Sequence, residues 1–194
     1  GGDGGCLREL VKYRSTEKIV QVEIDADVVE VSRKFFPNIS SANEHHKVNI
    51  VIEGALDYIK RCKIQFDIVI VDGSDPVGPA VKLFESDFIS EVYSVLSEDG
   101  IMVNQLGSPF YDGRRVNETL SLMNKSFFVT KLYVAHIPSY PSGVWGIGFS
   151  AKNDNFLKNP DEVSYLTIYD DLKYYNLETH RAAFILPEYM HRSI

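Results

Sequence analysis

The sequence has 194 residues, of which 44% are hydrophobic and 24% are charged, a length and composition typical of one soluble globular domain with a buried core. No apolar run approaches the roughly 20 residues that span a bilayer, and no charged leader with an apolar core is present, so we expect neither a membrane anchor nor an export signal. The net charge of −7 argues against a nucleic-acid surface, which needs clustered Lys and Arg, and favours the attraction of cationic ligands.

Hydrophobic periodicity predicts helices and strands that alternate along the chain. The expected helices cover residues 7–13, 26–36, 55–62, 84–96 and 115–125. The expected strands cover residues 19–24, 48–52, 68–71 (entered from 66–67), 100–104, 127–136 and 144–151, of which the last two form a closing pair. Residues 152–169 are the most loop-like stretch, and residues 170–194 have helical character. Together, residues 152–194 are expected to form a C-terminal appendage.

Strands that alternate with helices predict an α/β fold with a parallel, doubly wound sheet covered on both faces. Ligands of such sheets bind beyond the carboxyl ends of the strands, near the topological switch point. The features expected at those ends are the loop 1–5, Glu23, Glu53, Asp72 and Gln105. The sequence therefore predicts one ligand site along this edge.

The chain opens with a glycine-rich loop, Gly-Gly-Asp-Gly-Gly at residues 1–5. Glycines allow sharp turns and a close approach of the backbone to a ligand. Glu23 ends a strand about 20 residues later, the spacing at which a carboxylate accepts hydrogen bonds from ribose hydroxyls. The pair does not select a cofactor, because dinucleotide-binding proteins share it. Such a loop normally follows the first strand, so we expect that strand to precede Gly1 and residues 1–194 alone to fold poorly.

The most informative segment is residues 68–80, in which a buried strand leads into a loop rich in Pro and Gly. This loop carries two carboxylates, Asp72 and Asp75, and rigid loops at strand ends commonly position catalytic groups. The turn Tyr-Pro-Ser-Gly at residues 140–143 is a second rigid element, suited to direct the Tyr140 phenol to the same cleft. An ordinary turn with capping aspartates and an ordinary turn tyrosine are the alternative interpretations.

Taken together, these segments resemble the signatures of the spermidine synthase family of polyamine aminopropyltransferases. The matching segments are GGDGG at 1–5, VEID at 22–25, DxSDPxGPA at 72–80, YPSG at 140–143 and HRAAF at 180–184. The resemblance covers essentially the whole chain, and its specific part is the pair at 72–80 and 140–143. It implies a Rossmann-like fold with a methyltransferase-type sheet. Residues 1–194 would then be the catalytic, nucleoside-binding domain of a longer enzyme, without the family's N-terminal β-domain and first strand.

The resemblance also implies a reaction, the transfer of an aminopropyl group from decarboxylated S-adenosylmethionine to a diamine. Putrescine is the expected acceptor, and spermidine and methylthioadenosine are the expected products. Asp72 would be the general base. The remaining implied site residues are Asp75, Tyr140 and Gln105 for the diamine, and Asp3, Glu23, Glu53, Gly54, Pro79 and Ala80 for the nucleoside.

Two features of the site leave alternatives open. Glu53-Gly54 stands where the family usually has Asp-Gly, so the contact of Glu53 with the adenine amine is in doubt. An S-adenosylmethionine-dependent amine N-methyltransferase is the nearest alternative function, because such enzymes share this fold, although Asp3 facing an aminopropyl ammonium favours aminopropyl transfer. The second alternative is a non-catalytic paralogue that serves as a binding or regulatory subunit, against which the presence of both Asp72 and Asp75 argues.

The expected partners are the small-molecule substrates and further copies of the chain, as a homodimer or homotetramer, with neither nucleic acid nor membrane. The sulfonium nucleoside would be a co-substrate, so no cofactor is implied, and no Cys/His cluster has zinc spacing. Cys6 and Cys62 are too few for a disulfide framework, which agrees with a reducing compartment and predicts a cytoplasmic protein. The choice among putrescine, cadaverine, agmatine and longer amines stays open.

Overall fold

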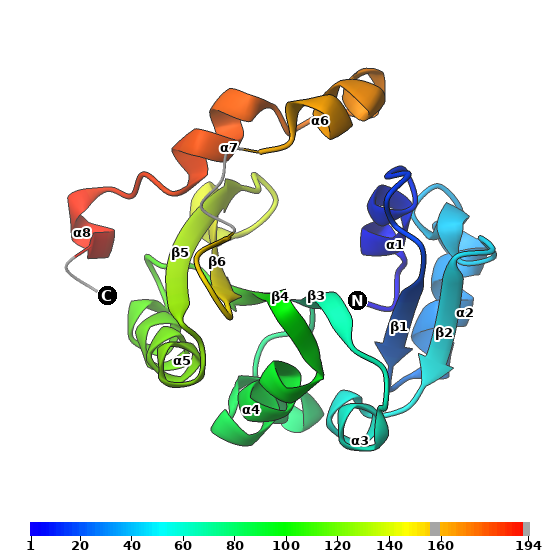
Figure 1. Cartoon of the computed structure of the whole chain (residues 1–194), viewed down its shortest axis with the longest axis horizontal. Helices are drawn as coiled ribbons and strands as arrows, with labels where there is room; N and C mark the ends of the chain where they lie inside the picture. Colours follow the sequence, from blue (N-terminus) through cyan, green and yellow to red (C-terminus); the bar gives the residue numbers. More distant parts are fainter. Residues whose placement is uncertain (156–159, 192–194) are drawn as a thin grey trace. The chain divides into compact units, whose positions relative to one another are not determined.

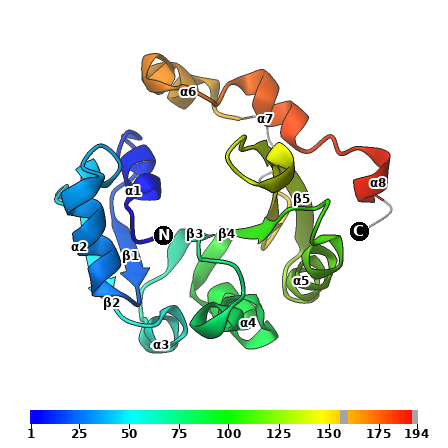
Figure 2. The same ribbon diagram turned by 180° about the vertical axis from the view of Figure 1, so that it is seen from behind.

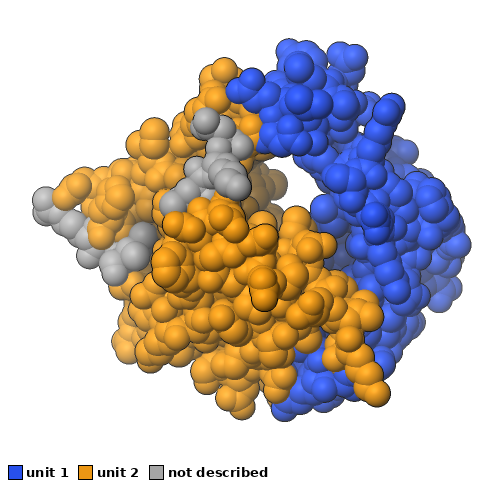
Figure 3. Space-filling model, viewed as in Figure 1, with its two compact units in different colours: residues 1–61, 161–171 blue, residues 62–160, 172–194 orange. Residues whose placement is uncertain are grey.

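The computed structural model describes residues 1–155 and 160–191. Residues 156–159 and 192–194, on which parts of the predicted loop and C-terminal appendage fall, lie outside the described residues. The chain divides into two compact units, shown in different colours in Figure 3. Unit 1 comprises residues 1–61 and 161–171, and unit 2 comprises residues 62–160 and 172–194. Each unit is described by itself below.

Unit 1 is built on a two-stranded parallel sheet, β1-β2, with helices beside it (Figure 1). Its elements are α1 (Gly5–Leu10), β1 (Ile19–Glu23), α2 (Ala26–Phe35), η1 (Ser40–Ala42), β2 (Val48–Ile52), α3 (Ala55–Arg61), α6 (Glu162–Ile168) and η5 (Tyr169–Asp171). The register pairs Glu23 with Ile52 at the carboxyl ends of the two strands. Glu23 ends β1, and Glu53 directly follows the last residue of β2. The two side chains therefore lie at the same edge of the sheet.

A small apolar core holds unit 1 together. Leu7 of α1, Ile19 of β1 and Ala42 of η1 are buried against one another, with Val48 and Ile50 of β2 packed onto them. This contact explains why the glycine loop before α1 is fixed against the strand ends.

Unit 2 is built on a four-stranded sheet in the order β3-β4-β6-β5. Its elements are β3 (Phe66–Val71), η2 (Gly78–Phe84), α4 (Ser86–Val95), β4 (Leu96–Gly107), α5 (Gly113–Ser126), β5 (Val129–His136), η3 (Pro141–Gly143), β6 (Val144–Ala151), α7 (Leu177–Ala183) and α8 (Glu188–His191). Strands β3 and β4 are parallel, whereas β6 runs antiparallel to both β4 and β5. The α/β class is confirmed, and the strands expected at 127–136 and 144–151 as a closing pair are β5 and β6, which pair antiparallel. The physical reason is the short connection 137–143 between β5 and β6, because a parallel crossover needs a dozen or more residues.

Helices α4 and α5 contact each other and lie beside the sheet of unit 2, as the two opposite views in Figures 1 and 2 show. The helices contribute Phe88, Ile89 and Met123 to the core, and β4 contributes Met102; all four side chains are at most 2% exposed. Full burial of an apolar side chain of this size contributes about 1.5–3 kcal/mol. The buried core of unit 2 thus supports β3 and β4, whose carboxyl ends carry the predicted acidic loop.

Most predicted elements are present, with differences at their ends. The first part of the helix expected at 84–96 belongs to the 3-10 helix η2, and the strand expected at 100–104 is the longer β4. The loop-like stretch 152–169 contains α6, which was not predicted. The Asp161 carboxylate begins this helix by accepting hydrogen bonds from the backbone N–H groups of Val163 and Ser164. The predicted helical character of the C-terminal segment is confirmed by α7 and α8.

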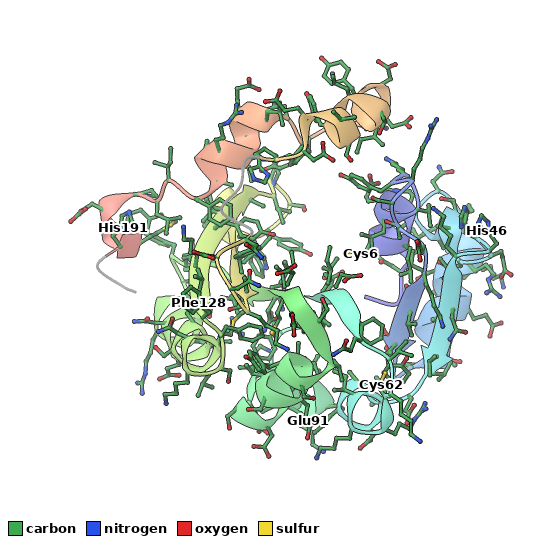
Figure 4. All side chains as sticks on the ribbon, in the orientation of Figure 1. Cys6, His46, Cys62, Glu91, Phe128 and His191 are labelled. Atoms are coloured by element: carbon green, nitrogen blue, oxygen red, sulfur yellow. The ribbon has the colours of Figure 1, made fainter. Side chains whose placement is uncertain are left out.

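Figure 4 shows the side chains, with Cys6 labelled in unit 1 and Cys62 in unit 2. Both cysteines are half-buried. None of the helices within residues 1–155 and 160–191 has the length and apolar character that crossing a membrane requires.

Candidate active site

The glycine loop and the Glu23 carboxylate lie directly against each other in unit 1. A Cβ atom added to Gly2 would stand 2.7 Å from Glu23 Oε2 and 2.8 Å from Val28 Cγ1, so only glycine fits there without moving its neighbours. The other oxygen, Glu23 Oε1, accepts a hydrogen bond from the Asp25 backbone N–H at 3.0 Å. The carboxylate is thereby oriented at the carboxyl end of β1.

Gly4 and Asp3 set the path of the loop into α1. Gly4 has φ of 87°, a left-handed conformation that residues with a Cβ rarely adopt, and an added Cβ would collide with Asn43 Oδ1. Asp3 Oδ1 accepts a hydrogen bond from the Gly5 backbone N–H at 2.9 Å. The loop is therefore a defined turn, and its exposed Asp3 carboxylate is held at the start of α1.

Glu53 forms an ion pair with Arg61, the last residue of α3. Arg61 Nε donates to Glu53 Oε1 and Oε2 at 3.0 and 3.1 Å, and Arg61 Nη2 also donates to Oε2. These hydrogen bonds lower the pKa of Glu53 below its ordinary value. The guanidinium also lies over the Tyr58 ring, 5.0 Å from its centroid. The longer side chain of Glu53, compared with the usual aspartate, thus reaches a partner within its own unit.

In unit 2, β3 leads directly into the acidic loop. Val71, the last residue of β3, is buried, whereas Asp72 and Asp75 are both exposed. The loop turns at Asp75, whose backbone carbonyl accepts a hydrogen bond from the Val77 N–H at 2.6 Å. The 3-10 helix η2 follows with Pro79 and Ala80 in its first turn. A buried strand therefore presents two carboxylates on a short, turned loop, as the sequence predicts.

Gln105 connects this loop to the tyrosine turn. The β3–β4 register pairs Val71 with Asn104, so Gln105 lies level with Asp72 on the adjacent strand. Gln105 Nε2 donates to the carbonyl oxygens of Gly73 and Ser74 at 3.1 and 3.4 Å. Its Oε1 accepts a hydrogen bond from Trp145 Nε1 at 3.0 Å.

Trp145 in turn contacts Tyr140, with ring centroids 4.6 Å apart in an edge-to-face arrangement. The Tyr140 side chain sits at the start of a turn that other contacts hold rigid. Ser142 is a non-glycine residue with φ of 67°, a strained conformation that persists only where its surroundings fix it. Its hydroxyl pairs with the Ser108 hydroxyl at 2.8 Å, and Ser108 is buried.

The predicted site residues therefore fall into two groups. Unit 1 holds Asp3, Glu23, Glu53 and Gly54, and unit 2 holds Asp72, Asp75, Pro79, Ala80, Gln105 and Tyr140. Sequence reasoning missed Trp145 and Arg61. The signal for Trp145 was available, because it is the only tryptophan of the chain and follows the tyrosine turn closely.

His180 belongs to unit 2, apart from the contacts described above. Its Nδ1 lies 3.0 Å from the Tyr175 hydroxyl, and burial, with the charge of Arg181, lowers the pKa of the imidazole. A structural, hydrogen-bonded histidine fits this geometry. Within residues 1–155 and 160–191, no three His, Cys, Asp or Glu side chains are grouped as ligands of a metal ion.

Comparison with known proteins gives consistent matches. The sequence model of the family described as "Spermine/spermidine synthase domain" matches residues 1–159. A polyamine aminopropyltransferase of Thermoanaerobacter sp. (strain X514) is 44% identical over 98% of this chain and 68% of its own length. A polyamine aminopropyltransferase of Caldicellulosiruptor saccharolyticus is 40% identical over 100% of this chain and 69% of its own length.

A solved structure agrees with these matches. The crystal structure of a spermidine synthase in complex with the transition state analogue AdoDATO has a TM-score of 0.94 and 34% identity, and the match covers 100% of this chain and 66% of that one. The Rossmann-like α/β fold class is thereby confirmed. The chain spans about two thirds of the length of the relatives that it matches.

Proposed function

The chain belongs to the spermine/spermidine synthase family, and we propose that it transfers an aminopropyl group from decarboxylated S-adenosylmethionine to putrescine, giving spermidine and methylthioadenosine. The observation that carries this proposal is the acidic loop after β3. It presents Asp72 and Asp75, and Gln105 and Trp145 connect it to Tyr140. Carboxylates suit a reaction in which both substrates are cationic.

The nucleoside roles rest first on unit 1. Glu23 accepts hydrogen bonds from the ribose hydroxyls, a role supported by its contact with Gly2 at the end of β1. Asp3 binds the aminopropyl ammonium, and its exposed position at the start of α1 supports this. Glu53 and Gly54 face the adenine, with the Glu53 carboxylate steadied by Arg61. The remaining nucleobase contacts are assigned to Pro79 and Ala80.

The amine roles rest on unit 2. A neutral amine nitrogen attacks the aminopropyl carbon next to the sulfonium; the new C–N bond forms as the C–S bond breaks, and the electron pair returns to sulfur. Asp72 accepts the proton that the nitrogen loses, while Asp75 and Tyr140 bind the diamine. A free aspartic acid has a pKa of about 3.9 and an alkylammonium about 10.4. A carboxylate therefore cannot simply deprotonate a solvated ammonium, and it accepts the proton as the bond forms and the nitrogen becomes acidic.

The sulfonium nucleoside is a co-substrate in this scheme, and the reaction as proposed uses no further cofactor. The same family membership leads us to propose a cytoplasmic protein that forms a homodimer or homotetramer. Analytical ultracentrifugation would test the oligomeric state.

Mass spectrometry of the reaction products tests the proposed activity. The protein is incubated with putrescine and either decarboxylated or ordinary S-adenosylmethionine. We expect spermidine and methylthioadenosine with the decarboxylated compound, and far slower formation of both by Asp72→Asn under the same conditions. A methylated amine formed only from ordinary S-adenosylmethionine would establish the N-methyltransferase instead. No product from either compound, with methylthioadenosine still bound, would establish the non-catalytic paralogue.

A further inference from the structure

We propose that Gln105 is a positioning residue of the active site and not a ligand of the amine. Its side chain holds the acidic loop 72–80 and the turn 140–143 in fixed positions relative to each other. This inference rests on the proposed function, because it assigns a role within that reaction. It also assigns a role to Trp145, the other end of the same bridge.

The orientation of the Gln105 amide follows from the chemistry of its partners. Backbone carbonyls only accept hydrogen bonds, and an indole N–H only donates. The amide nitrogen must therefore face Gly73 and Ser74, at 3.1 and 3.4 Å, and the amide oxygen must face Trp145 Nε1, at 3.0 Å. The amide nitrogen is thus directed at the loop that carries Asp72.

These contacts leave little capacity for a substrate. An ammonium group offers only N–H donors, so it could pair with Gln105 only through Oε1. The indole N–H already takes one of the two lone pairs of this oxygen. The exposed carboxylates of Asp72 and Asp75 are far better acceptors for a cation. Gln105 is half-buried, as is Trp145, so the hydrogen bonds between them are partly shielded from competing water.

The bridge also determines where the Tyr140 phenol lies. Tyr140 is 46% exposed, and its ring packs edge-to-face with the Trp145 ring at a centroid distance of 4.6 Å. The indole N–H is held by the Gln105 oxygen. One amide therefore fixes two elements that flank the amine, the loop with the general base and the turn with the phenol.

Two substitutions test the bridge with minimal change of shape. Gln105→Met keeps the length of the side chain and removes both polar atoms. Trp145→Phe keeps an aromatic ring beside Tyr140 and removes the N–H. The matched control is Gln65→Met, the same chemical change at an exposed position just before β3, at the opposite end of that strand from Asp72.

We expect Gln105→Met to lower kcat at saturating putrescine about 10- to 100-fold, the range for a small displacement of reacting groups. The KM for putrescine should rise less than kcat falls, because only the Tyr140 contact with the diamine is displaced. Trp145→Phe should lower kcat in the same direction. The double variant should be no worse than Gln105→Met alone, because both changes break one bridge. The opposite pattern, a raised KM for putrescine with normal kcat and additive effects, would establish Gln105 as an amine ligand and overturn the proposal.

The fluorescence of Trp145 tests the bridge without turnover. The difference spectrum between the wild type and Trp145→Phe isolates this indole, and Gln105→Met should change that spectrum whereas Gln65→Met should not. An unchanged spectrum would overturn the bridge. A wild-type protein without aminopropyl transfer would refute the proposed function and leave this test standing. If Gln105→Met fails to fold, Trp145→Phe alone decides: normal kcat would overturn the proposal.

Discussion

The role of Glu23 can be tested from two independent sides. Glu23→Ala removes the carboxylate. Gly2→Ala keeps the carboxylate but forces it to move, because the added Cβ would stand 2.7 Å from Oε2 and 2.8 Å from Val28 Cγ1. Oε1 is already held by the Asp25 N–H at 3.0 Å, so Oε2 is the oxygen that both substitutions affect. Both should weaken binding of methylthioadenosine for the same reason.

The expected size follows from the bond that is lost. A hydrogen bond to a charged acceptor contributes about 1.5–3 kcal/mol, which corresponds to a Kd about 10- to 150-fold higher. Glu23→Ala should reach this range, and Gly2→Ala should approach it. Isothermal titration calorimetry with methylthioadenosine measures the Kd directly. Thermal unfolding of each variant checks that loss of the Asp25 contact has not unfolded the protein.

The matched control is Glu17→Ala. Glu17 is exposed and precedes β1, at the opposite end of the strand from Glu23, so the variant loses the same charge without touching the glycine loop. Its Kd should equal that of the wild type. A Glu23→Ala protein that is folded and binds methylthioadenosine normally would remove Glu23 from the site. Equal weakening in Glu17→Ala would attribute the effect to net charge.

Four further substitutions test the general base, the binding of the diamine, the conformation of the glycine loop and the pH dependence of stability. Asp72→Asn keeps its size but cannot accept a proton, so turnover should fall by about two to four orders of magnitude with little change in nucleoside affinity; near-normal turnover at saturating diamine would contradict this. Asp75→Asn should instead raise the KM for the diamine, by weakening a charge-assisted hydrogen bond; kinetics with the diamine varied would test it, and an unchanged KM would count against that role. Gly4→Ala should destabilise the protein by about 1–3 kcal/mol in urea unfolding, whereas Gly113→Ala, whose added Cβ meets nothing within 4 Å, should not. Burial lowers the pKa of His180, so the contribution of the neutral imidazole to stability is fully present above the unfolded pKa of about 6.5 and is lost as the pH falls through the folded value. His180→Gln should therefore flatten the fall of Tm on acidification. An unaltered dependence of Tm on pH would refute this role of His180.

The positions of most elements could be predicted because hydrophobic periodicity follows burial. The strand predicted at 144–151 coincides with β6, and that at 48–52 with β2. The carboxylates at strand ends were visible because Asp72 directly follows a continuous apolar run. The local geometry of the glycine loop was also foreseeable, since Gly4 adopts a φ of 87° that only glycine tolerates readily.

Strand direction and the α6 helix were harder to predict. Alternation of helices and strands predicts parallel pairing where a helix connects two strands, but it gives no direction for the closing pair 127–136 and 144–151. The short connection 137–143 between these two strands is what favours an antiparallel hairpin. Helix α6 has only the residues Glu162–Ile168, and Val163 and Leu166 on it are largely exposed. A helix that buries so little gives no clear amphipathic pattern, and Asp161 as its N-cap was the only local signal.

The contact between Gln105 and Trp145 shows why a site cannot be completed from a sequence alone. The two residues are 40 positions apart, and they meet only because β6 runs antiparallel to β4, with Gln105 opposite Ile147. If β6 ran parallel to β4, the start of β6 would lie at the other end of β4, away from Gln105. The antiparallel direction of β6 is therefore what joins the acidic loop to the tyrosine turn, and a sequence pattern that gives 144–151 only as a member of a closing pair does not show this contact.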